Sequence, residues 1–169
     1  MSEINMTESH MLAGKYLTFN LAEEIYGIET LKVREIISLM EITAVPQTPA
    51  YVRGVINLRG KVIPIVDLRS RFGMEDHEYQ ERTCIIVIEI EEDDPQSQVG
   101  VVVDTVMEVL NVQDDDIDTT PAFGVKLATQ YISGVAKIKG QVIILLDIER
   151  VLEDANFVPV ANEAEEEVN

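Results

Sequence analysis

The chain has 169 residues, of which 46% are hydrophobic, and it carries a formal net charge of −18. Such a charge repels phosphate backbones and anionic lipid surfaces, which argues against nucleic-acid binding and against direct membrane insertion. The length suits one compact unit or two small, closely packed ones, and the core must be aliphatic because tryptophan is absent.

Nothing in the chain predicts export or a membrane span. The single cysteine, Cys84, lies within an apolar run, and a buried free thiol is typical of the reducing cytoplasm. The N-terminal residues have neither the basic region nor the apolar core of a signal peptide, and the longest apolar runs are too short to span a bilayer. These features predict a cytoplasmic protein.

The first part of the chain predicts β-structure. Apolar residues alternate with polar ones over residues 15–21, which places Leu17, Phe19 and Leu21 on one face of a strand. Arg59-Gly60 is expected to form a tight hairpin turn, because glycine readily takes the positive φ that such a turn needs. The expected elements are strands over 15–21 and 24–28, a short helix from Thr30 to Glu35, an apolar stretch over 36–45 that Pro46 ends, strands over 52–58 and 61–68 with Pro64 marking an edge or bulge, and a short helix capped by Asp67.

The second part of the chain predicts a similar series. The expected elements are strands over 83–90 and 99–103, a short helix from Asp104, a strand over 106–112, a hairpin over 135–146 that turns at Lys139-Gly140, and a helix over 148–155 capped by Asp147.

These two parts are also similar in sequence. Residues 51–68 match residues 131–148 at an offset of 80, without a gap and with seven identical positions. Upstream, residues 27–37 match residues 100–110, and a Thr-Pro follows each block. Two matching blocks in the same order indicate an internal duplication.

We infer two homologous halves, about residues 16–80 and 83–154, which form two similar subdomains. About five short strands in each half predict a small closed barrel, since closure removes the exposed strand edges that promote aggregation.

No set of residues predicts catalysis, a cofactor or a metal. His10 lies in the polar N-terminal arm, His77 lies in a charged linker, and Cys84 lies in a predicted core strand without an activating base. Histidine and cysteine are too few and too scattered for a zinc site. The stretch from Gly54 to Val62 does not have the glycine spacing of a phosphate-binding loop, and Asp114 to Asp118 lacks the glycine and glutamate of an EF-hand.

One half carries a basic stretch that its duplicate lacks. Residues 51–72 hold five basic residues against one acidic residue, or +4, whereas residues 131–152 hold three against two, or +1. Alternation places Arg53, Val55, Asn57 and Arg59 on the face opposite Val52, Ile56 and Leu58. Arginines on an outer hairpin face are ordinary, but the mixture with Asn57 and Val55 also suits a protein partner.

The motifs resemble those of the chemotaxis coupling protein family CheW. The resemblance rests on residues 51–69, on residues 26–36, on Thr48-Pro49 and on residues 99–104, and it covers about residues 15–155. It implies a mainly β fold of two five-stranded SH3-like barrels that share an apolar core, with a few short helices. It assigns residues 15–155 to a CheW-like domain, which leaves a flexible arm over 1–14 and a tail over 156–169 that its acidic composition predicts to be disordered.

The resemblance also implies a non-enzymatic adaptor function. Family members couple the cytoplasmic tips of methyl-accepting chemotaxis proteins to the histidine kinase CheA, whose regulatory domain has the same fold, within receptor arrays. Carried over by motif, the receptor-binding positions are Val33, Glu35, Gly54, Asn57, Arg59, Val106 and Val109, with Arg59 foremost. No local motif marks the kinase-facing residues.

Three other functions remain open at this stage. A CheW-like domain could serve a pilus or another signalling pathway. The coupling half of a CheV-type protein would need a receiver domain, for which this chain is too short. A barrel-type nucleic-acid binder would need a basic groove with stacking aromatic residues, which the charge and the scarcity of aromatic residues oppose.

Overall fold

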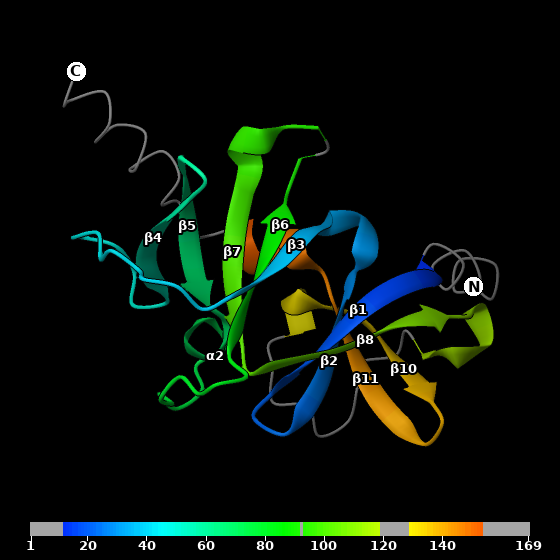
Figure 1. Ribbon diagram of the computed structural model, residues 1–169. Helices are drawn as coiled ribbons and strands as arrows, with labels where there is room; N and C mark the ends of the chain where they lie inside the picture. The colour runs from blue at the N-terminus through cyan, green and yellow to red at the C-terminus, as the bar shows by residue number, and fades with distance from the viewer. Residues whose placement is uncertain (1–11, 92, 119–128, 154–169) are drawn as a thin grey trace.

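A computed structural model of the chain describes residues 12–91, 93–118 and 129–153. The described chain is mainly β, in two sheets of six and five strands (Figure 1). The elements are β1 (Gly14–Leu21), β2 (Glu24–Glu29), the 3₁₀ helix η1 (Thr30–Lys32), β3 (Val33–Ser38), β4 (Val52–Leu58), β5 (Lys61–Asp67), α2 (Leu68–Arg71), β6 (Cys84–Glu89), η2 (Pro95–Ser97), β7 (Gln98–Val103), β8 (Thr105–Val112), η3 (Asp114–Asp116), β9 (Ile117–Asp118), η4 (Thr129–Tyr131), β10 (Ile132–Ile138), β11 (Gln141–Leu146) and α3 (Ile148–Glu153).

The predicted strands and the helices that follow Asp67 and Asp147 are confirmed. Both aspartates cap as expected, since the carboxylate of Asp67 accepts the Ser70 N–H at 3.2 Å and that of Asp147 accepts the Arg150 N–H at 3.2 Å. Pro64 lies one residue before β5 begins its ladder with β7, so at that point β5 pairs with β4 alone. Its missing N–H therefore costs no bond to β7.

Two predicted helices are wrong. The helix from Thr30 to Glu35 shrinks to the three residues of η1, because the β-branched residues that follow pair as β3 with β6. Asp104 starts no helix, and β8 begins at the next residue. Its carboxylate instead accepts hydrogen bonds from the Arg69 guanidinium and from the Ala22 N–H.

The two sheets exchange hairpins between the sequence halves. One sheet has the strand order β3-β6-β7-β5-β4, and the other has β8-β1-β2-β11-β10-β9. Each sheet thus takes the first hairpin of one half and the remaining strands of the other half. The inserted hairpins join their hosts through the parallel pairs β5–β7 and β2–β11. The prediction that each half builds its own barrel is therefore wrong.

Short connections explain this exchange. Suppose that the first half kept its own β1–β2 hairpin in its sheet. β1 would then pair with β3 in the place of β6, and β2 would take the place of β7. β2 would therefore run parallel to β3, with β1 between them. A parallel crossover needs about a dozen residues or more, whereas η1 supplies three and Asp104 alone separates β7 from β8. Each hairpin must therefore enter the other sheet.

In each sheet, the segment that follows the strand at one end pairs with a strand at the opposite end, as expected for a barrel. Beyond β3 the chain returns to β4, where Thr43 and Val55 exchange two backbone hydrogen bonds of 2.8 Å. Beyond β8, β9 pairs with β10 at the duplicate position, Val135 opposite Asp118. The first bridge requires Gly54, which has φ +140° and whose added Cβ would lie 2.0 Å from the Thr43 carbonyl oxygen.

The shared core lies between the sheets. Its largest cluster joins strands of both halves with the helices α2 and α3, and aromatic rings run through it in the order Phe19, Tyr26, Phe72 and Tyr131 at centroid distances of 5.7–6.0 Å. Each sheet also has a smaller cluster of buried hydrophobic residues of its own. The predicted shared core is confirmed, and it is mainly aliphatic with several aromatic rings among its residues.

We expect neither half of the chain to fold by itself. Residues 1–81 lack the β6–β7 hairpin of their sheet, and residues 82–169 lack the β1–β2 hairpin of theirs. Circular dichroism should therefore show a cooperative melt for the mixed fragments and for neither fragment alone. A cooperative melt of one isolated half would contradict the importance of the exchange.

We expect Gly54→Ala to destabilise the fold by about 3 kcal/mol or more, because it combines backbone strain with overpacking. Gly60→Ala is the matched control, because Gly60 also has positive φ, +85°, but faces open space. That control should cost about 1–2 kcal/mol from strain alone. Urea denaturation of both variants measures the difference, and equal losses would show that the contact with Thr43 is unimportant.

Candidate partner-binding surface

The sequence-predicted receptor residues lie on three elements. Val33 and Glu35 lie on β3, Val106 and Val109 lie on β8, and the other three lie on the β4–β5 hairpin. β3 and β8 are duplicates of each other, and each is the first strand of its sheet. Each also carries a register shift at the same place, between Val33 and Glu35 and again between Val106 and Val109.

The structure joins Arg59 and Glu35 at the tip of the β4–β5 hairpin. The Arg59 guanidinium donates to the Glu35 carboxylate, and their side chains are 69% and 35% exposed. Arg59 and Gly60 both have positive φ, and the Asn57 side chain accepts the Gly60 N–H at 2.8 Å. Asn57 therefore fixes the turn that carries Arg59. An open cavity of about 420 Å³ lies beside this pair, with Arg34, Leu58, Lys61 and Gln98 among its lining residues.

The remaining predicted positions differ in accessibility. Gly54 is buried against the Thr43 segment, so the structure does not bring it to the surface beside Arg59. Val33 and Val106 are half-buried against the shared core, whereas Val109 is 53% exposed. Sequence reasoning missed two exposed apolar side chains on the same strands, Ile36 and Met107. The register shifts displace side chains from simple alternation, which hides them from a periodicity argument.

The basic stretch of the first half is largely neutralised within the protein. Arg69 binds the Asp104 carboxylate through two N–H groups at 2.8 and 2.5 Å. Burial alone would raise the pKa of Asp104, but Arg69 and the Ala22 N–H hold that pKa below its usual range. Arg71 lies over the rings of Tyr51 and Tyr131 and donates to the Val151 carbonyl at 2.7 Å. Both arginines therefore stabilise the contact between the halves.

Arg53 also has internal partners. Its Nε lies 3.3 Å from the buried Asp67 carboxylate and its Nη2 lies 3.2 Å from Asp76. Asp76 belongs to the link between the halves, residues 73–83, which we call the strap. Of the four residues predicted on one outer face, Arg53 is thus engaged by the strap and Val55 by Thr43. Asn57 and Arg59 remain exposed.

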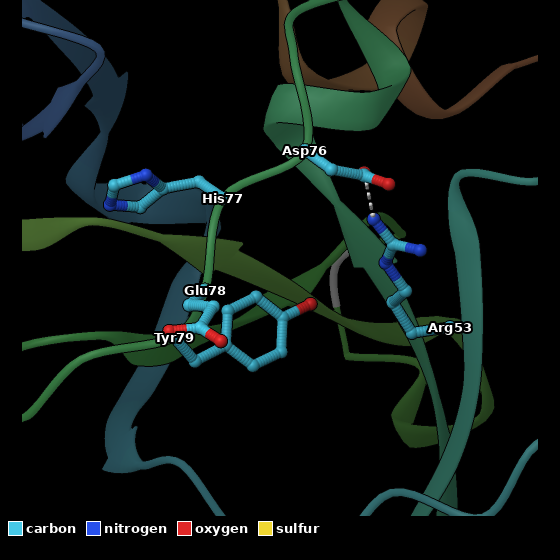
Figure 2. A pocket seen from close by; sticks show the side chains of 5 residues that line it. All are labelled: Arg53, Asp76, His77, Glu78 and Tyr79. Atoms are coloured by element: carbon cyan, nitrogen blue, oxygen red, sulfur yellow. Dashed lines mark hydrogen bonds and ion pairs between the residues drawn. The ribbon is translucent and has the colours of Figure 1, made fainter.

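The strap is fastened by a tyrosine. The Tyr79 hydroxyl donates to Asp67 at 2.7 Å, and burial together with this bond raises the Tyr79 pKa. A cavity of about 440 Å³ is lined by Arg53, Asp76, His77, Glu78 and Tyr79. Figure 2 shows Arg53 and Asp76 joined by an ion pair at one side of it, with the His77 ring pointing away from Arg53. His77 contacts Gln80, with 3.2 Å between the two nitrogens. This arrangement holds the strap to the sheet and aligns no nucleophile with a base.

The Cys84 thiol and the distribution of potential metal ligands bear on the remaining chemistry of the described residues. Burial raises the pKa of the Cys84 thiol, which opposes thiolate formation. No three His, Cys, Asp or Glu side chains in the described ranges gather as a metal site. His10 lies outside these ranges. No described helix is long and apolar enough to cross a membrane.

Comparison with known proteins gives a consistent result. A family model described as the CheW-like domain matches residues 15–156. A protein from Klebsiella aerogenes named chemotaxis protein CheW is 36% identical over 97% of this chain and 96% of its own length. Another of that name, from Rhizobium meliloti, is 37% identical over 80% of this chain and 84% of its own length.

A solved structure is similar as well. The crystal structure of the scaffolding protein TtCheW from Thermoanaerobacter tengcongensis superposes with a TM-score of 0.75 at 34% identity, covering 84% of this chain and 94% of that one. A match over most of the chain, with motifs, duplication and fold all in agreement, establishes the family. The chain belongs to the CheW-like domain family.

Proposed function

We propose that this chain is a non-enzymatic adaptor of bacterial chemotaxis that couples the cytoplasmic tips of methyl-accepting chemotaxis proteins to the histidine kinase CheA. Membership of the CheW-like family supports a scaffolding function in chemotaxis. The receptor tips lie in the cytoplasm. The half-buried free thiol of Cys84 suits that reducing compartment. A CheW-like adaptor of a pilus pathway would have the same features. A pull-down from the source organism with this chain as bait decides between the two pathways, because CheA and receptors would be recovered in one case and a pilus kinase in the other.

The observation that carries the proposal is the exposed pair of Arg59 and Glu35. Arg59 has five N–H donors in a fixed fork, and Glu35 engages part of them. The rigid turn and the carboxylate hold the guanidinium in one orientation, which lowers the entropy lost when a partner binds. An exposed ion pair is worth only about 0–1 kcal/mol. A receptor helix can therefore take over these donors at small cost.

Exposed apolar residues on β3 and β8 suit a helical partner. Ile36 on β3 and Met107 and Val109 on β8 are 41–53% exposed. Methionine adapts to irregular partners, and an amphipathic helix places apolar residues every three or four positions. Exposed apolar residues and an oriented arginine are the kinds of side chain that form the apolar core and the polar rim of protein interfaces.

We expect Arg59→Glu to weaken receptor binding about tenfold or more, because a charge reversal loses donors and places a carboxylate beside Glu35. Lys139→Glu is the matched control. Lys139 occupies the equivalent turn with φ 53°, against 52° at Arg59, and is also exposed. Isothermal titration against a receptor-tip peptide or fragment should show a loss for the first variant alone, with melting temperatures of both near that of the wild type.

A charge exchange separates the receptor contact from the internal ion pair. Glu35→Arg combined with Arg59→Glu restores an ion pair of opposite direction, so the fold should keep its stability. Receptor binding should stay weak, because the guanidinium is no longer at the hairpin tip. Full recovery of binding in this double variant would show that the pair acts through the fold alone and would overturn the assignment of Arg59.

We expect the purified chain to hydrolyse no ATP and to act by assembly. Added to CheA and receptor-containing membranes, it should raise kinase autophosphorylation, whereas it should have little effect on CheA without receptors. Radiolabelled phosphate transfer measures both conditions. Equal stimulation with and without receptors would contradict coupling, and ATP hydrolysis by the chain alone would contradict a non-enzymatic function.

A further inference from the structure

The cavity beside the Arg59–Glu35 pair gathers positive charge. Arg34, Arg59 and Lys61 all line this cavity of about 420 Å³, which we call the basic cavity. They come from β3 and from the β4–β5 hairpin, which belong to the same five-stranded sheet. Three of the 13 basic residues of a chain with net charge −18 therefore meet at one place.

A bulge in β3 brings Arg34 to the basic cavity. Val33 lies opposite Ile88 and Glu35 lies opposite Val87, so Arg34 is the extra residue on its strand. Neighbouring residues of a regular strand point to opposite faces, yet Arg34 and Glu35 line the same cavity. A bulge redirects a side chain in this way, and bulges are common beside functional sites.

Internal carboxylates hold the two arginines without using all of their donors. Nη2 of Arg59 donates to Glu35. Nε of Arg34 lies 3.5 Å from Oε2 of Glu89, whose side chain is only 11% exposed, and the same oxygen accepts the Gln98 side-chain amide at 3.2 Å. Each guanidinium has five N–H donors, so both arginines are oriented and retain donors for a further carboxylate.

Lys61 and Leu58 complete the lining. Lys61 is half-buried at the start of β5, and no acidic side chain in the described ranges forms an ion pair with it. The half-buried Leu58 and the buried Ile63 add apolar surface to the same cavity. Oriented cations beside apolar surface fit an acidic side chain, which ends in a carboxylate and has an apolar stem.

The second half lacks this charge although it forms the same backbone features. The extra residue of the β8 bulge is Met107, at the position of Arg34. Gln141 takes the position of Lys61, and only Lys139, at the position of Arg59, is a cation. The turns have φ 53° at Lys139 and 52° at Arg59. Neither the bulge nor the turn therefore requires Arg34 or Lys61.

We propose that the basic cavity receives an acidic side chain of the receptor tip. Its carboxylate pairs with Arg34, Arg59 and Lys61, and its stem contacts Leu58. This inference rests on the proposed function, because the cavity is continuous with the Arg59–Glu35 pair. Charge-assisted hydrogen bonds from two guanidinium groups are directional, so they select which position of the receptor helix lies at the cavity. Arg34 and Lys61 are thus specificity-determining residues.

Substitutions copied from the second half test the proposal. Arg34→Met and Lys61→Gln introduce the residues of the duplicate positions, so melting temperatures should stay near that of the wild type. In isothermal titration with a receptor-tip fragment, each variant should bind about threefold more weakly and the double variant about tenfold more weakly. The dependence of affinity on salt should decrease in parallel, because charged contacts are lost.

A charge-conserving variant separates a local contact from the overall charge. Lys61→Gln combined with Gln141→Lys moves one cation to the second half and leaves the net charge at −18. This variant should bind the receptor fragment as weakly as Lys61→Gln alone. Recovery of wild-type affinity would overturn the proposal, because the loss would then reflect long-range attraction.

Double-mutant cycles identify the acidic partner. Each glutamate or aspartate of the receptor fragment is replaced in turn by its amide. One replacement should weaken binding to the wild-type chain but not to the Arg34→Met, Lys61→Gln variant. If no acidic position is coupled to the cavity while Arg59→Glu still weakens binding, this proposal fails and the proposed function stands. If Arg59→Glu and the cavity variants all bind like the wild type, the receptor surface itself is wrong.

Discussion

Three residues connect β2 to β3, and Asp104 alone connects β7 to β8. These connections cannot return a chain to a parallel strand two positions away, so each hairpin leaves its own half and completes the sheet of the other. The rest of the structure depends on this constraint. It intertwines the halves, buries the aromatic rings between the sheets and leaves β3 and β8 as end strands that carry exposed aliphatic side chains.

The intertwined halves are held by contacts that cross between duplicates. Arg71 of the first half donates to the carbonyl of Val151, which is its own duplicate position, and lies over Tyr51 and the duplicate Tyr131. Arg71 and Val151 must therefore both lie near the axis that relates the two halves. An arginine on one side and a valine on the other break the symmetry, which lets one guanidinium serve both tyrosines.

One ion pair connects each helix to the link that follows the first hairpin of the other half, and the two pairs have opposite polarity. Arg69 of α2 binds Asp104, whereas Glu149 of α3, the duplicate of Arg69, binds Lys32. If like halves were paired, Arg69 would meet Lys32 and Glu149 would meet Asp104. The charges thus agree with the connection lengths in favouring the exchanged arrangement, and agreement between local and global preferences is typical of sequences with a single native structure.

The arginines of the basic stretch differ in where their counter-charges lie. Arg53, Arg69 and Arg71 are close in sequence to Arg59, but they are bound by Asp67, Asp104 and the shared core, respectively. Arg59 alone stands at a hairpin tip, with its partner Glu35 also accessible. The proposed partner-binding residue is thus distinguished from the structural arginines by the exposure of its counter-charge, which is a property of the tertiary structure.

The sequence by itself determined most of the local elements, the duplication and the family. Alternation along β1, the two hairpin turns and the capping aspartates all report interactions between residues close in the chain, and the matched blocks required no coordinates. Only the tertiary structure decided that Gly54 is buried under Thr43, that Arg59 meets Glu35 and that the hairpins are exchanged. These features depend on contacts between segments far apart in sequence, and a periodic pattern shows which face of a strand is apolar without showing which strand lies beside it.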